Sequence, residues 1–183
     1  MIKYLILNKS AVKRIIGKLI EQKKEWLIDE KKEDGFTPLH LACLNNHSEV
    51  VKLIIEFRHQ YINTKNLNLQ TALHLAIDRQ HYEIVKYLLE KKCNVNLQNK
   101  DGDTPFHCLI RNHNLNHIKQ YVADKKLSNK SHGIKMIEEL SCQLIDNDAN
   151  LYTKNKKHQT ALDLLSDPDL TQFLVNQYQN KMR

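Results

Sequence analysis

Apolar residues recur along this chain at helical spacing, in short runs that come in pairs. In one pair, Leu39, Leu41 and Ala42 begin the first run, and the stretch 49–55 forms the second. Apolar positions three to four residues apart predict amphipathic helices. Because two short helices cannot bury their apolar faces alone, each pair is expected to stack on the next one. The pattern therefore predicts an all-α solenoid built from helix-turn-helix units.

A threonine-led motif opens each pair of helices. It begins at Thr37, Thr71, Thr104 and Thr160, so successive motifs are 34, 33 and 56 residues apart, and the last interval is one period of 33 plus 23 surplus residues. A threonine hydroxyl can cap the free amides at the start of a helix, and a proline directly after it suits the first helical turn. The motif thus marks where each unit begins.

The motif at residues 37–42, Thr-Pro-Leu-His-Leu-Ala, and its period of about 33 residues resemble the ankyrin repeat. The resemblance implies an ankyrin-repeat solenoid with short β-hairpin or loop fingers between the units. Asp34-Gly35 and Asp101-Gly102 are β-turn dipeptides that suit finger tips. The other two fingers contain Asn66 and Asn155, and we expect asparagine to take the left-handed positions there that glycine usually occupies.

The repeat register divides a single ankyrin-repeat domain, residues 1–183, into five parts. These are a partial N-terminal repeat (1–33), two repeats (34–65 and 66–98), a repeat with an insertion near 123–133 (99–154), and a C-terminal capping repeat with a tail (155–183). Residues 123–133 are polar without apolar periodicity, which predicts an exposed loop. Residues 148–151 are interpreted as the same repeat ending as 94–97, and Pro168 is expected to interrupt the second half of the last unit.

Composition indicates the cellular location of the protein more clearly than the identity of its partner. The chain has a net charge of +7, but its lysine pairs are scattered and interleaved with Glu and Asp, which favours a solvated surface. No run reaches the roughly 18 apolar residues of a membrane span. The four cysteines, which form no C-x-x-C pair, are Cys43, Cys93, Cys108 and Cys142. They occupy apolar positions, as buried free thiols do, so we expect a reducing, cytoplasmic location.

The candidate chemistry is sparse. Cys108, His113 and His117 have a loose zinc-like spacing, but a fourth ligand and paired thiols are missing. The motif histidines His40, His74 and His107 are interpreted as structural. No phosphate loop or catalytic signature is present. We therefore expect no enzyme activity, metal, cofactor or small-molecule substrate.

The expected function is a binding surface, because the ankyrin resemblance implies a concave groove lined by fingers and first helices. Projecting the repeat register gives the partner-binding candidates Phe36, Leu44, Asn45, Leu67, Asn68, Gln70, Asp78, Arg79, Asp103, Arg111 and Asn112. Among them, Phe36 and Leu67 are predicted to be exposed apolar side chains, and arginines of the kind that anchor interfaces accompany them. Mixed charges on this surface favour a protein or peptide partner over nucleic acid. We also expect the chain to act as a monomer.

Several local features together are similar to the mind bomb family. They are residues 34–37, Asn45-Asn46-His47, residues 70–76, Arg79-Gln80-His81, residues 101–105, the insertion, Asn155-Lys156-Lys157, residues 162–164 and Asp167-Pro168. The resemblance covers about residues 26–175 and implies a part of a RING-type E3 ubiquitin ligase that promotes endocytosis of Notch ligands. The paired Cys and His zinc ligands of a RING are absent from this sequence, so catalysis does not transfer to it.

Two alternative functions stay open at this point. One is a stand-alone ankyrin adaptor or effector unrelated to ubiquitin, and the other is a basic binder of nucleic acid or membrane surfaces.

A separate hypothesis concerns a modification of Asn96, because Leu88 with Asn94-Val95-Asn96 resembles the target of an asparaginyl hydroxylase that acts on ankyrin repeats. The competing interpretation of Asn96 is a structural side chain that bridges a turn.

Overall fold

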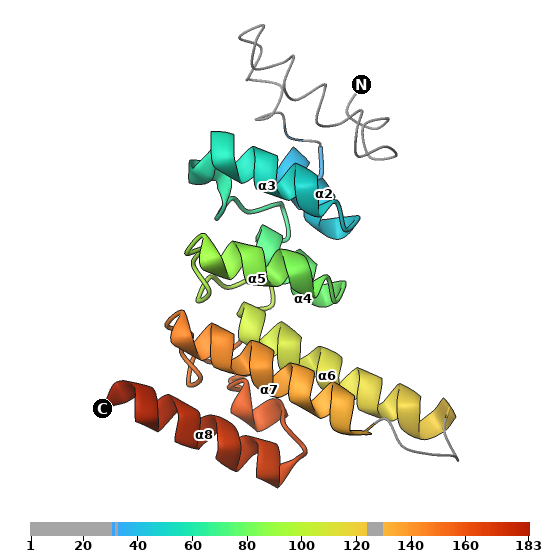
Figure 1. Ribbon diagram of the computed structural model, residues 1–183, viewed down its shortest axis with the longest axis vertical. Coiled ribbons are helices and arrows are strands. Elements are labelled where there is room, and N and C mark those ends of the chain that lie inside the picture. The colour runs from blue at the N-terminus through green and yellow to red at the C-terminus, as the bar shows by residue number, and fades with distance from the viewer. Residues whose placement is uncertain (1–30, 32, 124–129) are drawn as a thin grey trace, which may run out of the picture. The chain divides into compact units, whose positions relative to one another are not determined.

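The computed structural model in Figure 1 describes the backbone of residues 31, 33–123 and 130–183, and the side chains of these residues outside 115–135. The chain divides into two compact units, residues 1–93 and 94–183, and each is described by itself. The partial repeat expected at 1–33 lies almost wholly outside the described residues, as do residues 124–129 of the expected insertion. The single continuous array stays a prediction.

The described part of the first unit contains two helix-turn-helix pairs. Helices α2 (Pro38–Leu44) and α3 (Ser48–Phe57) form one pair, α4 (Ala72–Asp78) and α5 (Tyr82–Glu90) form the other, and the short 3-10 helix η3 (His59–Tyr61) follows α3. Helix α2 packs on α3 and on α4, and α5 packs on both α3 and α4. The fully buried large side chains are Leu39, Ile54, Ile55, Leu73, Ile77, Ile84 and Leu88. The predicted stacking of paired helices is therefore confirmed.

Both first helices of this unit begin at a reciprocal cap between a threonine and the histidine three residues later. The backbone amide of His40 donates to Thr37 Oγ1 at 3.4 Å, and the backbone amide of Thr37 donates to His40 Nδ1 at 3.2 Å. Thr71 and His74 repeat this arrangement in α4. Two amides at the helix start are thus satisfied by side chains. This is why the threonine and the histidine occur together in the motif.

The second unit contains longer helices than the first. Helix α6 (Pro105–Ala123) has 19 residues and α7 (Lys130–Asp146) has 17, whereas α2 and α4 have 7 each. The surplus residues therefore lengthen both helices of the third repeat. The expected loop at 123–133 was too wide, because Ala123 ends α6 and residues 130–133 begin α7. Figure 1 shows α6 and α7 lying side by side along the unit.

The last repeat differs from the others in both halves. Its threonine motif forms only the 3-10 helix η4 (Leu162–Leu164), and α8 (Pro168–Met182) follows. Contrary to the expectation, Pro168 does not interrupt this helix but occupies its first turn, where proline is well tolerated. Asp167 caps the helix, because its Oδ1 accepts hydrogen bonds from the amides of Asp169 and Leu170. Helix α8 packs on α7. The expected polar cap is thus a full helix.

The register of the repeat endings also needs a correction. Lys92 and Asp148 hold the same left-handed position after their helices, with φ 58° and 68°. Residues 94–97 therefore correspond to 150–153 rather than to 148–151. The hydrogen bonds agree, because Asn94 Oδ1 accepts from the amide two residues on, and Asn150 Oδ1 does the same, both at 2.9 Å.

The described helices and loops contain no strand, which confirms the all-α fold class. The expected fingers are loops. We refer to residues 33–36, 66–70, 99–103 and 155–159 as fingers one to four. Two backbone bonds close each of the last three. In finger two they run from the Asn66 amide to the Gln70 carbonyl at 3.0 Å and from the Leu69 amide to the Asn66 carbonyl at 2.9 Å. In the part of the chain that is described, no helix is both long enough and apolar enough to cross a membrane.

Candidate interaction surface

Fingers two, three and four are built on an asparagine that folds the loop around its side chain. In finger two, Asn66 Oδ1 accepts from the amides of Asn68 and Gln70, both at 2.9 Å. Asn99 and Asn155 accept from the amides two and four residues on in the same way. These are Asx turns, in which a short polar side chain replaces backbone bonding.

In fingers two and four the left-handed residue is not the asparagine that we expected. It is Leu69 in finger two, with φ 57°, and His158 in finger four, with φ 60°. Gly35 and Gly102 hold this position in the other two fingers, with φ 76° and 78°. The asparagine was misassigned because its two possible roles, a left-handed backbone and a side-chain acceptor, leave the same trace in a sequence.

Neighbouring fingers within each unit meet through their backbones. The Leu67 amide donates to the Asp34 carbonyl at 3.2 Å in the first unit, and the Lys156 amide donates to the Asp101 carbonyl at 3.0 Å in the second. A Cβ on Gly102 would lie 2.7 Å from the nitrogen of Lys156. Glycine is therefore required there for close approach as well as for backbone angle.

Two motif histidines, His40 and His107, tie their first helix to the end of the next finger of the same unit. His40 Nε2 lies 3.1 Å from the Gln70 carbonyl oxygen, and His107 Nε2 lies 3.1 Å from that of Gln159. Because Nδ1 accepts a backbone amide, Nε2 must carry the proton in the neutral ring and donate it. Burial lowers the pKa of His40 and of His107, although the bonds to the carbonyls oppose the shift. Neutral imidazoles thus fix the spacing between helix and finger.

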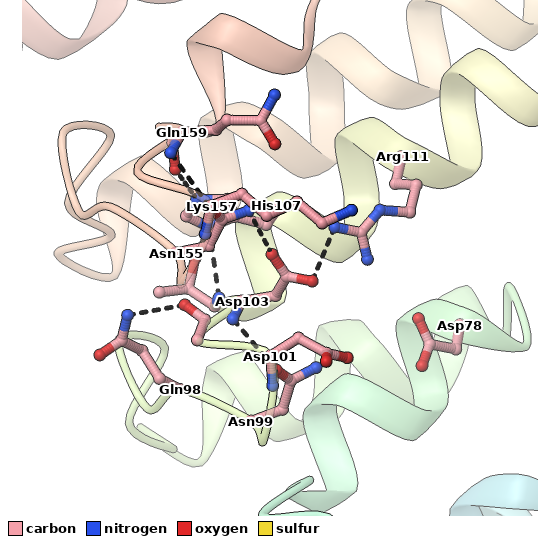
Figure 2. A network of polar contacts seen from close by, with 12 residues as sticks. Asp78, Gln98, Asn99, Asp101, Asp103, His107, Arg111, Asn155, Lys157 and Gln159 are labelled. Carbon is pink, nitrogen blue, oxygen red and sulfur yellow. Dashed lines mark hydrogen bonds and ion pairs between the residues drawn. The ribbon is translucent and has the colours of Figure 1, made fainter.

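A buried carboxylate connects finger three, helix α6 and finger four (Figure 2). Asp103 Oδ1 accepts from Asn155 Nδ2 at 2.9 Å, and Asp103 Oδ2 forms an ion pair with Arg111 at 2.7 Å. The Asp103 side chain is 1% exposed, whereas that of Arg111 is 45% exposed. Burial alone would lower the pKa of Arg111, but the bond to Asp103 raises it. The guanidinium is therefore held in place while part of it faces solvent.

The same two positions are also paired in the first unit, with different chemistry. Gln70 ends finger two, and its Nε2 donates to Asp78 Oδ2 at 3.4 Å, eight residues further along. Asp103 and Arg111 are likewise eight residues apart. The repeat thus places a polar pair where finger and first helix meet, and the sequence of each repeat sets its charge.

The predicted partner-binding residues fall into three groups by exposure. Exposed are Asn45, Leu67, Asn68, Asp78, Arg79 and Arg111; half-buried are Phe36, Leu44, Gln70 and Asn112; and Asp103 is buried. Phe36 was expected to be exposed but packs edge-on against the His40 ring, with centroids 5.8 Å apart. Asp103 was expected on the surface, but its carboxylate is taken up by Arg111 and Asn155. Whether any of these residues contacts a partner stays a prediction.

Sequence reasoning missed one exposed leucine of the fingers. Leu69 is 45% exposed, two residues after Leu67, which is 66% exposed. Lys156 and Lys157, which the repeat register also projects onto the binding surface, are exposed on finger four. The alternation Asn66-Leu67-Asn68-Leu69 was a usable signal for finger two. An Asx turn puts both leucines on the outside of the loop, where neither can join the core.

The cysteines are packed rather than poised for reaction. Cys43, Cys93 and Cys108 are buried and free, and Cys142 is half-buried. Burial raises the pKa of Cys43 and of Cys142, and it raises that of Cys93 to about 12. A thiol is nucleophilic as its thiolate, which burial disfavours. Within the described side chains, which exclude that of His117, no group of three or more His, Cys, Asp or Glu is placed to hold a metal ion.

Asn96 bridges two repeat endings of the second unit. Its Nδ2 donates to the Asp148 carbonyl at 2.7 Å, and its Oδ1 accepts from the Asn150 amide at 2.8 Å. The side chain is part of an exposed loop. The structural role considered for Asn96 is thus present in the geometry, and its hydroxylation stays a prediction.

Comparison with known proteins agrees with this architecture. A family model described as ankyrin repeats, in three copies, matches residues 4–99. The chain is also 42% identical over 178 residues to the E3 ubiquitin-protein ligase mind-bomb of Drosophila melanogaster. That similarity covers 94% of this chain and 14% of the fly protein. The predicted resemblance to both families is confirmed.

Proposed function

Because the chain belongs to the ankyrin-repeat family, we propose that it is a non-catalytic module that docks a protein or peptide through its fingers and first helices. The observation that carries this proposal is finger two, which exposes Leu67 and Leu69 on a loop that Asn66 and a left-handed residue hold rigid. Exposed apolar side chains on a rigid loop bind a partner at low entropic cost.

Exposed charged residues accompany these leucines in the first unit. Asp78 and Arg79 end helix α4, and both are exposed. Apolar side chains rimmed by charged ones are typical of interfaces between proteins. Asn45 and Asn68 add amides that can bond a peptide backbone. The first unit therefore offers the mixture of groups that a protein surface requires.

We further propose that the module belongs to a ubiquitin ligase related to mind bomb, where it holds a partner in the cytoplasm. The similarity to the fly ligase supports this proposal, and the activity of that whole protein is not transferred to the chain, which spans 14% of it. A role in Notch signalling and action as a monomer belong to the same proposal. Neither a small-molecule substrate nor nucleic acid is part of it.

Affinity capture from cytosol tests the docking surface. The variant Leu67→Ala/Arg79→Ala removes one exposed apolar side chain and one cation from the surface formed by fingers and first helices. Its matched control, Phe57→Ala/Lys52→Ala, removes the same two kinds of group from α3, the second helix of its pair, where Phe57 is 48% exposed. Circular dichroism first establishes that both variants are folded.

We expect proteins that the parent and the control retain and that the finger variant loses. Identical captures by all three chains would refute docking through fingers and first helices. If only the control variant loses captured proteins, the binding surface lies on the second helices instead.

A further inference from the structure

The second unit carries a basic patch that the finger-two surface does not share. We define it as Arg111 on α6 with Lys156 and Lys157 on finger four. All three residues are exposed. Among the residues that the structure describes, neither lysine ammonium forms an ion pair, and each lysine is held only through its backbone.

The patch is fixed by buried polar contacts. Arg111 pairs with Asp103, Asp103 accepts from the side chain of Asn155, and Asn155 Oδ1 in turn accepts from the Lys157 amide at 2.9 Å. Figure 2 shows this chain of contacts running from α6 through finger three into finger four. The Arg111 side chain and the backbone of the two lysines are therefore held in place, so that mainly the lysine side chains lose conformational freedom when a ligand engages them.

The surroundings leave the patch positive. Residues 152–159 contain three lysines, Lys154, Lys156 and Lys157, and no acidic residue. Asp103 is already occupied by Arg111. In fingers three and four and in η4, the exposed acids are Asp101 and Asp163, and Asp163 is bonded to Thr160 and lies near Lys154. An anionic ligand is thus complementary to this surface.

We propose that this patch binds an acidic segment of a protein partner, with the solvent-facing part of Arg111 taking a carboxylate and Lys156 and Lys157 taking further ones. The inference rests on the proposed function, because it names the chemistry of the partner. Guanidinium binds carboxylate through paired donors, and the ion pair with Asp103 orients it for that contact. A peptide is favoured over nucleic acid because the patch as defined holds three basic residues, whereas a phosphate backbone requires a longer basic stripe.

Titration of the ¹⁵N-labelled chain with a short peptide of alternating glutamate and serine tests this inference, and a peptide of alternating glutamine and serine is the uncharged control. We expect amide shifts in fingers three and four and around Arg111, with Gly35 in the first unit unchanged. The shifts should weaken with added salt, because exposed charges are screened.

Two charge-reversal variants locate the binding. Lys156→Glu/Lys157→Glu should weaken the glutamate peptide by about tenfold, since each reversal replaces an attraction by a repulsion. Lys91→Glu/Lys92→Glu changes the net charge equally at the end of α5 and should leave binding unchanged. Equal loss in both variants, or no shifts in fingers three and four, would overturn the proposal.

Two further titrations separate the competing anions. Tighter binding of a single-stranded oligonucleotide, or of vesicles rich in phosphatidylserine, at the same residues would also overturn the assignment to an acidic peptide. Failure of the glutamate peptide would leave the proposed docking function standing if the finger-two variant still loses its captured proteins. The two ideas therefore fail independently.

Discussion

Asp103 and Arg111 lie eight residues apart in the sequence and 2.7 Å apart in space, one buried and the other half in solvent. Gln70 and Asp78 hold the same two positions in the first unit and also meet. The repeat therefore supplies a fixed place for a polar pair, and individual substitutions change its charge without changing the backbone. This arrangement lets one fold present different surfaces from repeat to repeat.

Removing the buried carboxylate should destabilise the second unit. We expect Asp103→Ala to lower the free energy of unfolding by about 2 kcal/mol, because it leaves the Asn155 amide without its acceptor and Arg111 without its counterion. Urea unfolding measures the change. Asp101→Ala, at an exposed carboxylate, should change it by less than about 0.5 kcal/mol. Similar losses in both variants would show that burial of Asp103 is not the cause.

Exchanging glycine and a larger residue at the left-handed position should have very different effects in fingers two and three. Gly102→Ala should cost about 2 kcal/mol or more, because its Cβ would meet the Lys156 nitrogen in a left-handed residue. Leu69→Gly should change stability by less than about 0.5 kcal/mol, since the relieved strain offsets the greater freedom of glycine in the unfolded chain. Thermal unfolding of both variants checks the contrast, and a harmless Gly102→Ala would contradict the close approach of the fingers.

Acid should destabilise the protein through its motif histidines. The folded pKa of His40 and of His107 lies below the ordinary value of 6.5, so their stabilising effect is complete above that pH and is lost as the pH falls through the lowered values. The unfolding free energy, measured by urea at a series of pH values from neutral to acidic, should fall more steeply for the parent chain than for His107→Gln. The exposed His158→Gln should follow the parent. Equal slopes in all three chains would exclude this linkage.

Ser141 offers a way to stabilise the second unit. Its side chain is fully buried, and Oγ finds no hydrogen-bond partner among the residues that the structure describes. The repeat register aligns it with Val51 and Val85, which are also fully buried. Ser141→Val should therefore be more stable than Ser141→Thr by about 1 kcal/mol, because the two side chains have similar shapes and only threonine keeps the hydroxyl. Urea midpoints measure the difference, and a more stable threonine variant would reveal a hidden partner for the hydroxyl.

The repeats and their helices were predictable because each depends on contacts close in sequence. The threonine-histidine cap spans three residues, so the start of every full first helix could be located from its motif. The insertion was less predictable, since its polar residues lack the apolar pattern that marks a helix. The exposure of Phe36 was predicted wrongly because the repeat register does not show that it packs on the His40 ring four residues on. The exposure of Asp103 was predicted wrongly because it is buried against Asn155, which is distant in sequence.

The sequence alone determined the all-α fold, the period, the starts of the full first helices and the membership of the ankyrin-repeat family, because these follow from apolar spacing and from caps within a few residues. Only the tertiary structure decided which finger side chains face solvent. Finger two and finger four both fold around an asparagine, yet one exposes leucines and the other exposes lysines beside a fixed arginine. The physical reason is that contacts between residues about 50 apart, such as that between Asp103 and Asn155, form only when the repeats stack.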